Sequence, residues 1–160
     1  MRSILWMSLV SLSLATGACK KKQDDTGKAA TEVKKTTEDV NEQAKDYRKT
    51  VEDKDSTNKD VTAAKGDLEA AKADLTAAKE RYSIALKDRM AKLDIKINEL
   101  EQRTDAKSKQ AEADLKARRD QLATKVDAIK DRTTADWDAF TKDVNDSFDK
   151  VEKDADDALK

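Results

Sequence analysis

The 160-residue chain contains no histidine and no proline, and only three glycines and one cysteine. Without histidine it lacks the commonest general base and the commonest metal ligand. Three separated glycines do not form a glycine-rich phosphate-binding loop. The absence of proline is typical of long, uninterrupted helices. The sequence therefore predicts a protein that is not an enzyme and that uses no cofactor and no metal.

Large apolar side chains are also scarce. Aromatic residues make up 4% of the chain, charged residues make up 42%, and the net charge is -1. Such a composition disfavours a globular core and favours elongated helices that bury one narrow stripe. A nucleic-acid interface would need a basic excess, so a nucleic acid is not expected as a partner. A small-molecule substrate is not expected either. Three acidic residues near the end, Asp154, Asp156 and Asp157, lack the glycine-centred loop of a calcium site and are expected to be solvated.

An apolar run lies at the N-terminus and ends at the one cysteine. Met1-Arg2 gives a positive start, 4–14 is rich in apolar residues, and 15–18 holds small residues before Cys19. This order is typical of a secretory signal peptide. The run is shorter than the roughly 20 residues that span a bilayer, so a retained membrane span is not expected.

The small residues Gly17 and Ala18 directly before Cys19 resemble the lipobox of bacterial lipoproteins. In that family the signal is removed before the cysteine, which then carries a diacylglyceryl thioether and an acylated amine. The resemblance implies cleavage after Ala18, lipid attachment at Cys19 and a place in the bacterial cell envelope. By the family's usual sorting rule, Lys20 implies the outer membrane, with the protein facing the periplasm. The alternative is an ordinary secretory signal with an unrelated cysteine beyond it.

Composition and periodicity divide the chain into four predicted segments. They are a signal peptide at 1–18, a flexible tether at 19–30, a first helix at 31–54 and a long helical hairpin or bundle at 59–160. The first helix is predicted from apolar residues spaced by seven and four on one helical face: Val33, Val40, Tyr47 and Val51. The run from Asp55 to Asn58 has no apolar residue and favours a turn, with Thr57 or Asn58 as the next helix cap.

The second helix begins with a heptad pattern that is typical of a coiled coil. Its large apolar residues, separated by alanines, are Val61, Leu68, Leu75 and Tyr82, and the seam continues through Leu86, Met90, Leu93, Ile97 and Leu100. From Arg103 to Gln110 there is no large apolar residue. Two interpretations are open for this stretch, a hairpin turn near 104–108 or one unbroken helix.

The apolar period then changes to eleven residues, which corresponds to three helical turns. The members of this repeat are Leu115, Val126, Trp137, Phe148 and Leu159. The repeat passes through 131–134, which argues against a large bend there. Thr133-Thr134-Ala135-Asp136 resembles a capping box, however, and indicates that a helix restarts at this point.

Charge indicates that the last helix folds back on the middle of the chain. Residues 81–130 hold 13 basic and 9 acidic side chains, and residues 134–160 hold 4 basic and 9 acidic ones. These opposite balances favour an antiparallel arrangement of the two segments. The last helix also carries an apolar stripe, which needs a covering surface: Trp137, Phe140, Val144, Phe148 and Val151. Core packing against this chain or a copy of it is favoured over a docking face for another protein.

Two further resemblances bear on function. The stretch from Tyr82 to Leu159 is similar to small bacterial helical coiled-coil proteins often labelled stress-response proteins. The shared features are a charged heptad helix, the segment 115–120, and a final helix opened by Ala135-Asp136-Trp137. The combination of Cys19, an alanine-rich heptad seam and Lys160 resembles the Braun-type outer-membrane lipoprotein, which implies a link from Lys160 to peptidoglycan.

These inferences predict an all-α protein, an elongated antiparallel helical hairpin or bundle with coiled-coil character behind a cleaved lipoprotein signal peptide. The expected function is a non-enzymatic, membrane-anchored lipoprotein acting as a structural or protein-interaction module in the bacterial periplasm. The expected partners are the membrane, through acylated Cys19, and another copy or another envelope protein through helical packing. The alternative is an amphipathic-helix factor that chaperones lipids or proteins under stress and exposes Trp137 and Phe140 to its clients.

Overall fold

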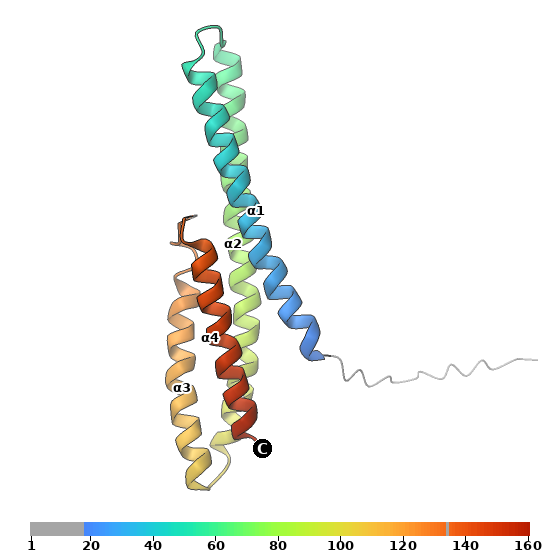
Figure 1. Ribbon diagram of the computed structural model, residues 1–160, viewed down its shortest axis with the longest axis vertical. Helices are drawn as coiled ribbons and strands as arrows, with labels where there is room; N and C mark the ends of the chain where they lie inside the picture. Colours follow the sequence, from blue (N-terminus) through green and yellow to red (C-terminus); the bar gives the residue numbers. More distant parts are fainter. Residues whose placement is uncertain (1–17, 134) are drawn as a thin grey trace, which may run out of the picture.

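The computed structural model describes residues 18–133 and 135–160 of the chain. These residues form four helices and no strand: α1 (Ala18–Glu52), α2 (Asn58–Glu101), α3 (Ala106–Asp127) and α4 (Trp137–Ala158). Figure 1 shows an elongated molecule in which α1 and α2 form a long pair and α3 and α4 lie along one half of α2. The predicted all-α, elongated helical bundle is therefore confirmed.

The turn between α1 and α2 lies where the sequence predicts it. Thr57 is the N-cap of α2, and its hydroxyl accepts a hydrogen bond from the Asp60 amide at 3.3 Å. The Asp60 carboxylate accepts one from the Thr57 amide at 2.9 Å, which completes a capping box. The first helix ends at Glu52, two residues before the predicted boundary at 54.

The predicted flexible tether at 19–30 is wrong, because the described backbone is already helical from Ala18. The segment holds four lysines, two alanines and one glutamine, which are good helix formers. Its one glycine, Gly27, has open space around it and leaves the helix unbroken. Ala29 and Val33 are buried in the core, so tertiary packing stabilises this end of α1.

Different helices pack on the long apolar seam of α2 along its length. The distal part of the molecule (residues 38–77) is called the arm. There α1 packs on the α2 seam, and no residue is fully buried. Val61 and Leu68 on α2 are half-buried, as are Val40 and Tyr47 on α1. In the proximal part, the bundle (residues 78–101 of α2 with α3 and α4), α3 and α4 cover the seam and its large residues are fully enclosed: Tyr82, Leu86, Leu93 and Leu100.

The hairpin interpretation of the stretch near 104–108 is right. α2 ends at Glu101 and α3 begins at Ala106. Asp105 caps α3, since its carboxylate accepts a hydrogen bond from the Ser108 amide at 2.8 Å. A solvated run without large apolar residues thus forms a turn even though it lacks glycine and proline.

Of the two indications at 131–134, the structure has the break between helices, and the argument from the eleven-residue repeat against a large bend is wrong. Arg118 pairs with Asp154 at 2.8 Å and Lys125 with Asp143 at 2.7 Å, so α3 and α4 run antiparallel. Figure 1 shows the same reversal. The eleven-residue repeat continues across this reversal because α3 and α4 each direct their own apolar stripe into the core. The N-cap of α4 is Asp136, which makes no side-chain cap hydrogen bond, and Thr133 only donates to the Asp136 carboxylate at 3.4 Å, so the predicted capping box does not start the helix.

The predicted charge complementarity of the last helix is present in the structure. The acidic side chains of α4 pair with basic side chains of all three other helices. The pairs are Lys34–Asp138, Arg89–Asp149, Arg89–Glu152, Lys96–Asp156, Arg118–Asp154 and Lys125–Asp143. Because the partners of α4 advance along α2 in the same direction as α4 itself, these two helices are parallel, while α3 is antiparallel to both.

Candidate functional sites

The predicted lipid-attachment residue lies at the start of the first helix. Ala18 and Cys19 are the first two residues of α1, and residues 1–17 of the predicted signal peptide at 1–18 lie outside the described residues. The described helices are too polar or too short in apolar length for any of them to traverse a bilayer. Lys160, the predicted wall-linkage residue, is exposed and places its Nζ 2.7 Å from an Asp157 carboxylate oxygen.

The predicted interaction stripe of α4 is part of the core. Its five residues, Trp137, Phe140, Val144, Phe148 and Val151, are between 0% and 7% exposed. The Trp137 ring lies edge-on to Tyr82, with 5.5 Å between ring centroids, and its Nε1 donates to the Ala30 carbonyl at 3.4 Å. Of the two interpretations, the structure has core packing against this same chain. The surface on which the chaperone alternative depends is thus covered by α1, α2 and α3.

A buried charge at the α2–α4 interface is the most unusual polar feature of the bundle. The Arg89 side chain is 8% exposed and donates from Nε and Nη2 to both carboxylate oxygens of Glu152 at 2.8 Å. Nη2 also donates to Asp149 at 2.7 Å, and the guanidinium lies 4.8 Å from the Phe148 ring centroid. Burial acts to lower the pKa of Arg89, but the hydrogen bonds and charges of Glu152 and Asp149 together raise it above its usual value.

Arg89 is not among the residues predicted to form a site, although the sequence holds a signal for it. The seven-residue step through Leu75 and Tyr82 reaches Arg89 next, so the heptad pattern places a charge on the seam. A charged residue at such a position needs a partner once it is buried. The acidic excess of the last helix was the natural source of that partner.

Tyr82 combines deep burial with an unsatisfied polar atom. It is fully buried, and its hydroxyl has no hydrogen-bond partner among the described residues. Burial raises the pKa of Tyr82 to about 12. The ring packs against Trp137 at the junction of α2 and α4. Its role is therefore packing, and the hydroxyl is carried at a cost in stability.

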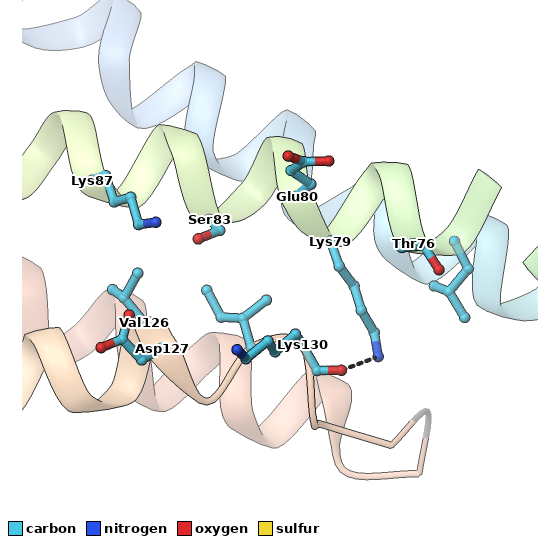
Figure 2. Close-up of a pocket in the computed structure, with 10 residues that line it drawn as sticks. Thr76, Lys79, Glu80, Ser83, Lys87, Val126, Asp127 and Lys130 are labelled. Atoms are coloured by element: carbon cyan, nitrogen blue, oxygen red, sulfur yellow. Dashed lines mark hydrogen bonds between the residues drawn. The ribbon is translucent and has the colours of Figure 1, made fainter. Parts of the chain in front are cut away.

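A cleft lies between α2 and the end of α3, with a volume of about 580 Å³ (Figure 2). Leu75, Val126 and Ile129 give it an apolar part, and lysines line its rim. Lys79 donates from Nζ to the carbonyls of Arg132 at 2.6 Å and Lys130 at 3.4 Å. These carbonyls follow the C-terminus of α3, where a cation is electrostatically favourable. Lys79 therefore links the α3–α4 turn to α2 by hydrogen bonds.

The cleft has no side-chain constellation for acid–base or nucleophilic chemistry. Its carboxylates, Glu80 and Asp127, are exposed to water, and its hydroxyls, Thr76 and Ser83, have no histidine beside them because the chain contains none. A carboxylate needs burial or a close charge partner to act as a tuned acid or base. The cleft geometry therefore supplies space and charge but no catalytic group.

No group of three or more potential ligands comes together in residues 18–133 and 135–160. The three acidic residues near the C-terminus instead make separate ion pairs: Asp154 with Arg118, Asp156 with Lys96 and Asp157 with Lys160.

Comparison with protein-family models, with curated proteins and with solved structures found no match to this chain.

Proposed function

We propose that this chain is a non-enzymatic lipoprotein of the bacterial envelope, held in the membrane by acylated Cys19. It acts in the periplasm as a structural or protein-interaction module. The observation that carries the proposal is the position of the lipobox cysteine as the second residue of α1. Anchor and arm then belong to one continuous helix. Three acyl chains on one residue make such an anchor effectively permanent.

The arm is the part of the molecule best suited to an interaction. α1 has 35 residues, so the α1–α2 turn lies about 50 Å along the helix from Cys19. In the arm only one helix packs against the seam, unlike in the bundle, and the apolar residues there stay half-exposed. Near the tip, Val51 is 53% exposed. Another helix, from a second copy or from an envelope protein, would complete the burial of this seam.

Two buried side chains of the bundle support the part of the proposal that concerns helix packing. The buried charge, Arg89, is held by two carboxylates, and the fully buried Tyr82 serves packing. These features support helix association.

The anchor and the arm are tested separately in cells. Cys19→Ser is expected to move the protein from the membrane fraction to the soluble fraction, and Lys20→Asp to move it from the outer to the inner membrane. A photo-crosslinking amino acid at Val51 is expected to join the arm to a second copy or to one envelope protein. The same group at Thr124, an exposed position on α3, serves as the control and is expected to give no such product. Unchanged membrane retention of Cys19→Ser, or equal crosslinking at both positions, contradicts the proposal.

A further inference from the structure

The two helices of the arm are held together by a thin apolar seam. Figure 1 shows that α3 and α4 stop short of the arm, so α1 and α2 pack only on each other there. The seam residues, among them Val40, Tyr47 and Leu68, are half-buried, and none is fully enclosed. A helix pair with so few buried apolar contacts opens more readily than the core of a bundle. The charges along its edges therefore have a larger share in its stability.

An ion pair just below the arm fixes which residues of α1 and α2 face each other. Arg81 donates from Nη2 to Glu32 at 2.6 Å across one edge of the two antiparallel helices. Seven residues are about two helical turns, so a step of seven along each helix reaches the same edge again. Towards the arm, this step replaces Glu32 by Asp39 and Arg81 by Asp74. An attractive pair at the base of the edge is therefore followed by two acids.

A groove on this edge of the arm contains the same acids. It is lined by Asp39 from α1 and by Asp67 and Asp74 from α2, and no basic residue lines it. These three side chains are exposed and make no ion pair or hydrogen bond among the described residues. Asp46, one further step of seven along α1, is level with Asp67 and has only Lys49 of its own helix nearby, at 3.7 Å. The residues three and four positions from Asp67 and Asp74 are all alanines, so no neighbour on α2 neutralises them.

The opposite edge of the arm repeats this pattern with the other sign. On α2, Lys65 and Lys72 lie across the seam from the groove, and the same register brings Arg48 of α1 level with Lys65. Lys72 pairs with Glu69 of its own helix at 2.9 Å, and the matching place on α1 holds the uncharged Asn41. Residues that flank the seam of a coiled coil usually pair with opposite charges. In the arm neither edge has such a pair, and both edges set like charges against each other.

We propose that the arm is a salt-dependent hairpin, in which repulsion along both edges favours separation of α1 and α2 at low ionic strength and salt closes them. The inference goes beyond the proposed function and does not depend on the lipid anchor. Like charges that face each other destabilise helices, and salt screens them because the Debye length falls from about 30 Å at 10 mM to about 8 Å at 150 mM. The bundle is expected to respond with the opposite sign, since ion pairs of unlike charge hold α4 to its neighbours and salt weakens them. Separation exposes the seam, so ionic strength sets how much of it a partner helix can reach.

Amide hydrogen exchange at 10 and 300 mM NaCl measures the opening of each helix in the mature acylated chain, held in micelles of an uncharged detergent. The variant Asp67→Lys/Asp74→Lys gives both groove positions the charge of Arg81, and Asp67→Gln/Asp74→Gln removes their charge without adding any. Lysine and glutamine have similar helix propensities, so the two variants differ mainly in charge. The control is Glu99→Lys/Asp131→Lys, which changes the net charge as the first variant does, at exposed positions outside the arm.

In the wild type and the control, exchange protection of the arm is expected to rise several-fold between 10 and 300 mM NaCl, while protection of the bundle stays level or falls. The rise is expected to shrink in the glutamine variant and to become a fall in the lysine variant, whose arm is also better protected than the wild type at 10 mM. Wild-type arm protection that stays level or falls with salt overturns the inference, and so does an equal rise in arm and bundle. A lysine variant with the salt response of the wild type overturns it as well. Each of these results leaves the lipid anchor of the proposed function in place.

Discussion

Replacing Arg89 by methionine tests whether burial sets the strength of the α2–α4 contact. Arg89 makes three hydrogen bonds to Glu152 and Asp149 while its side chain is 8% exposed. Methionine keeps an unbranched side chain against Phe148 but removes the charge and every donor. Arg119→Met is the matched control, because Arg119 makes a similar two-bond pair with Asp94, at 2.7 and 2.9 Å, at exposures of 32% and 39%.

The expected magnitudes follow from what each variant leaves behind. Removing one partner of a fully buried ion pair destabilises a protein by about 3–5 kcal/mol, since the other charge stays buried. Asp149 and Glu152 are 45% and 31% exposed and can regain water, so we expect Arg89→Met to lower the free energy of unfolding by about 1–2 kcal/mol. For Arg119→Met we expect about 0.5 kcal/mol, the typical value for an exposed pair.

Urea denaturation followed by circular dichroism at neutral pH measures both losses, with the midpoint and slope fitted for each variant. Urea is chosen over guanidinium chloride because it does not screen ion pairs. Equal losses for the two variants would refute the reasoning, because they would show that burial adds nothing to the Arg89 contact.

Three other perturbations have clear signs. Tyr82→Phe removes a buried hydroxyl that has no partner, so stability at pH 7 is expected to stay equal or to rise by up to about 1 kcal/mol in urea denaturation. Because burial raises the pKa of Tyr82 to about 12, the folded state keeps a proton that the unfolded state loses near pH 10. Stability is therefore expected to fall by about 2–3 kcal/mol more between pH 10 and pH 12 in the wild type than in Tyr82→Phe, and parallel pH profiles would contradict this. Leu93→Ala, at a fully buried position, is expected to cost about 2–5 kcal/mol in the same assay, against less than about 0.5 kcal/mol for Ile95→Ala two residues away in lipid-free protein. Similar costs for that pair would place the core on the wrong face of α2. Thr57→Ala removes the N-cap of α2 and is expected to cost about 1 kcal/mol, with the largest loss of amide-exchange protection in the first turn of α2. A uniform loss of protection along the helix would argue against a local capping effect.

The helical architecture could be predicted from the sequence because it depends on local signals. The polar run before Asn58 marks a turn, and Thr57 and Asp60 carry the side chains of a capping box. The heptad seam from Val61 onward locates the buried side of α2. Such signals act within a few residues and need no tertiary information.

The reversal between α3 and α4 could not be predicted in the same way. An eleven-residue repeat places Val126 and Trp137 on one stripe whether the chain continues or turns back, since the period describes each helix and not their connection. The choice is made by tertiary burial, because Trp137 and Phe148 can be enclosed only when α4 returns to α2 and α3. The prediction of a flexible tether at 19–30 was wrong for a related reason. Polar composition alone does not distinguish a coil from an exposed helix that is packed against the core through Ala29 and Val33.

Arg89 shows how far the contacts between helices could be predicted from the sequence. The sequence gives its heptad position and an acidic last helix, but not the parallel register that brings Asp149 and Glu152 to it. The cleft beside α3 is likewise defined by how two helices diverge, which no pattern in either helix specifies.

Mass spectrometry of the N-terminal peptide from membrane-extracted protein tests the central claim most directly. The account predicts a peptide that begins at Cys19, lacks residues 1–18 and carries the mass of three acyl chains. A peptide that retains the first 18 residues, or an unmodified Cys19, would contradict it.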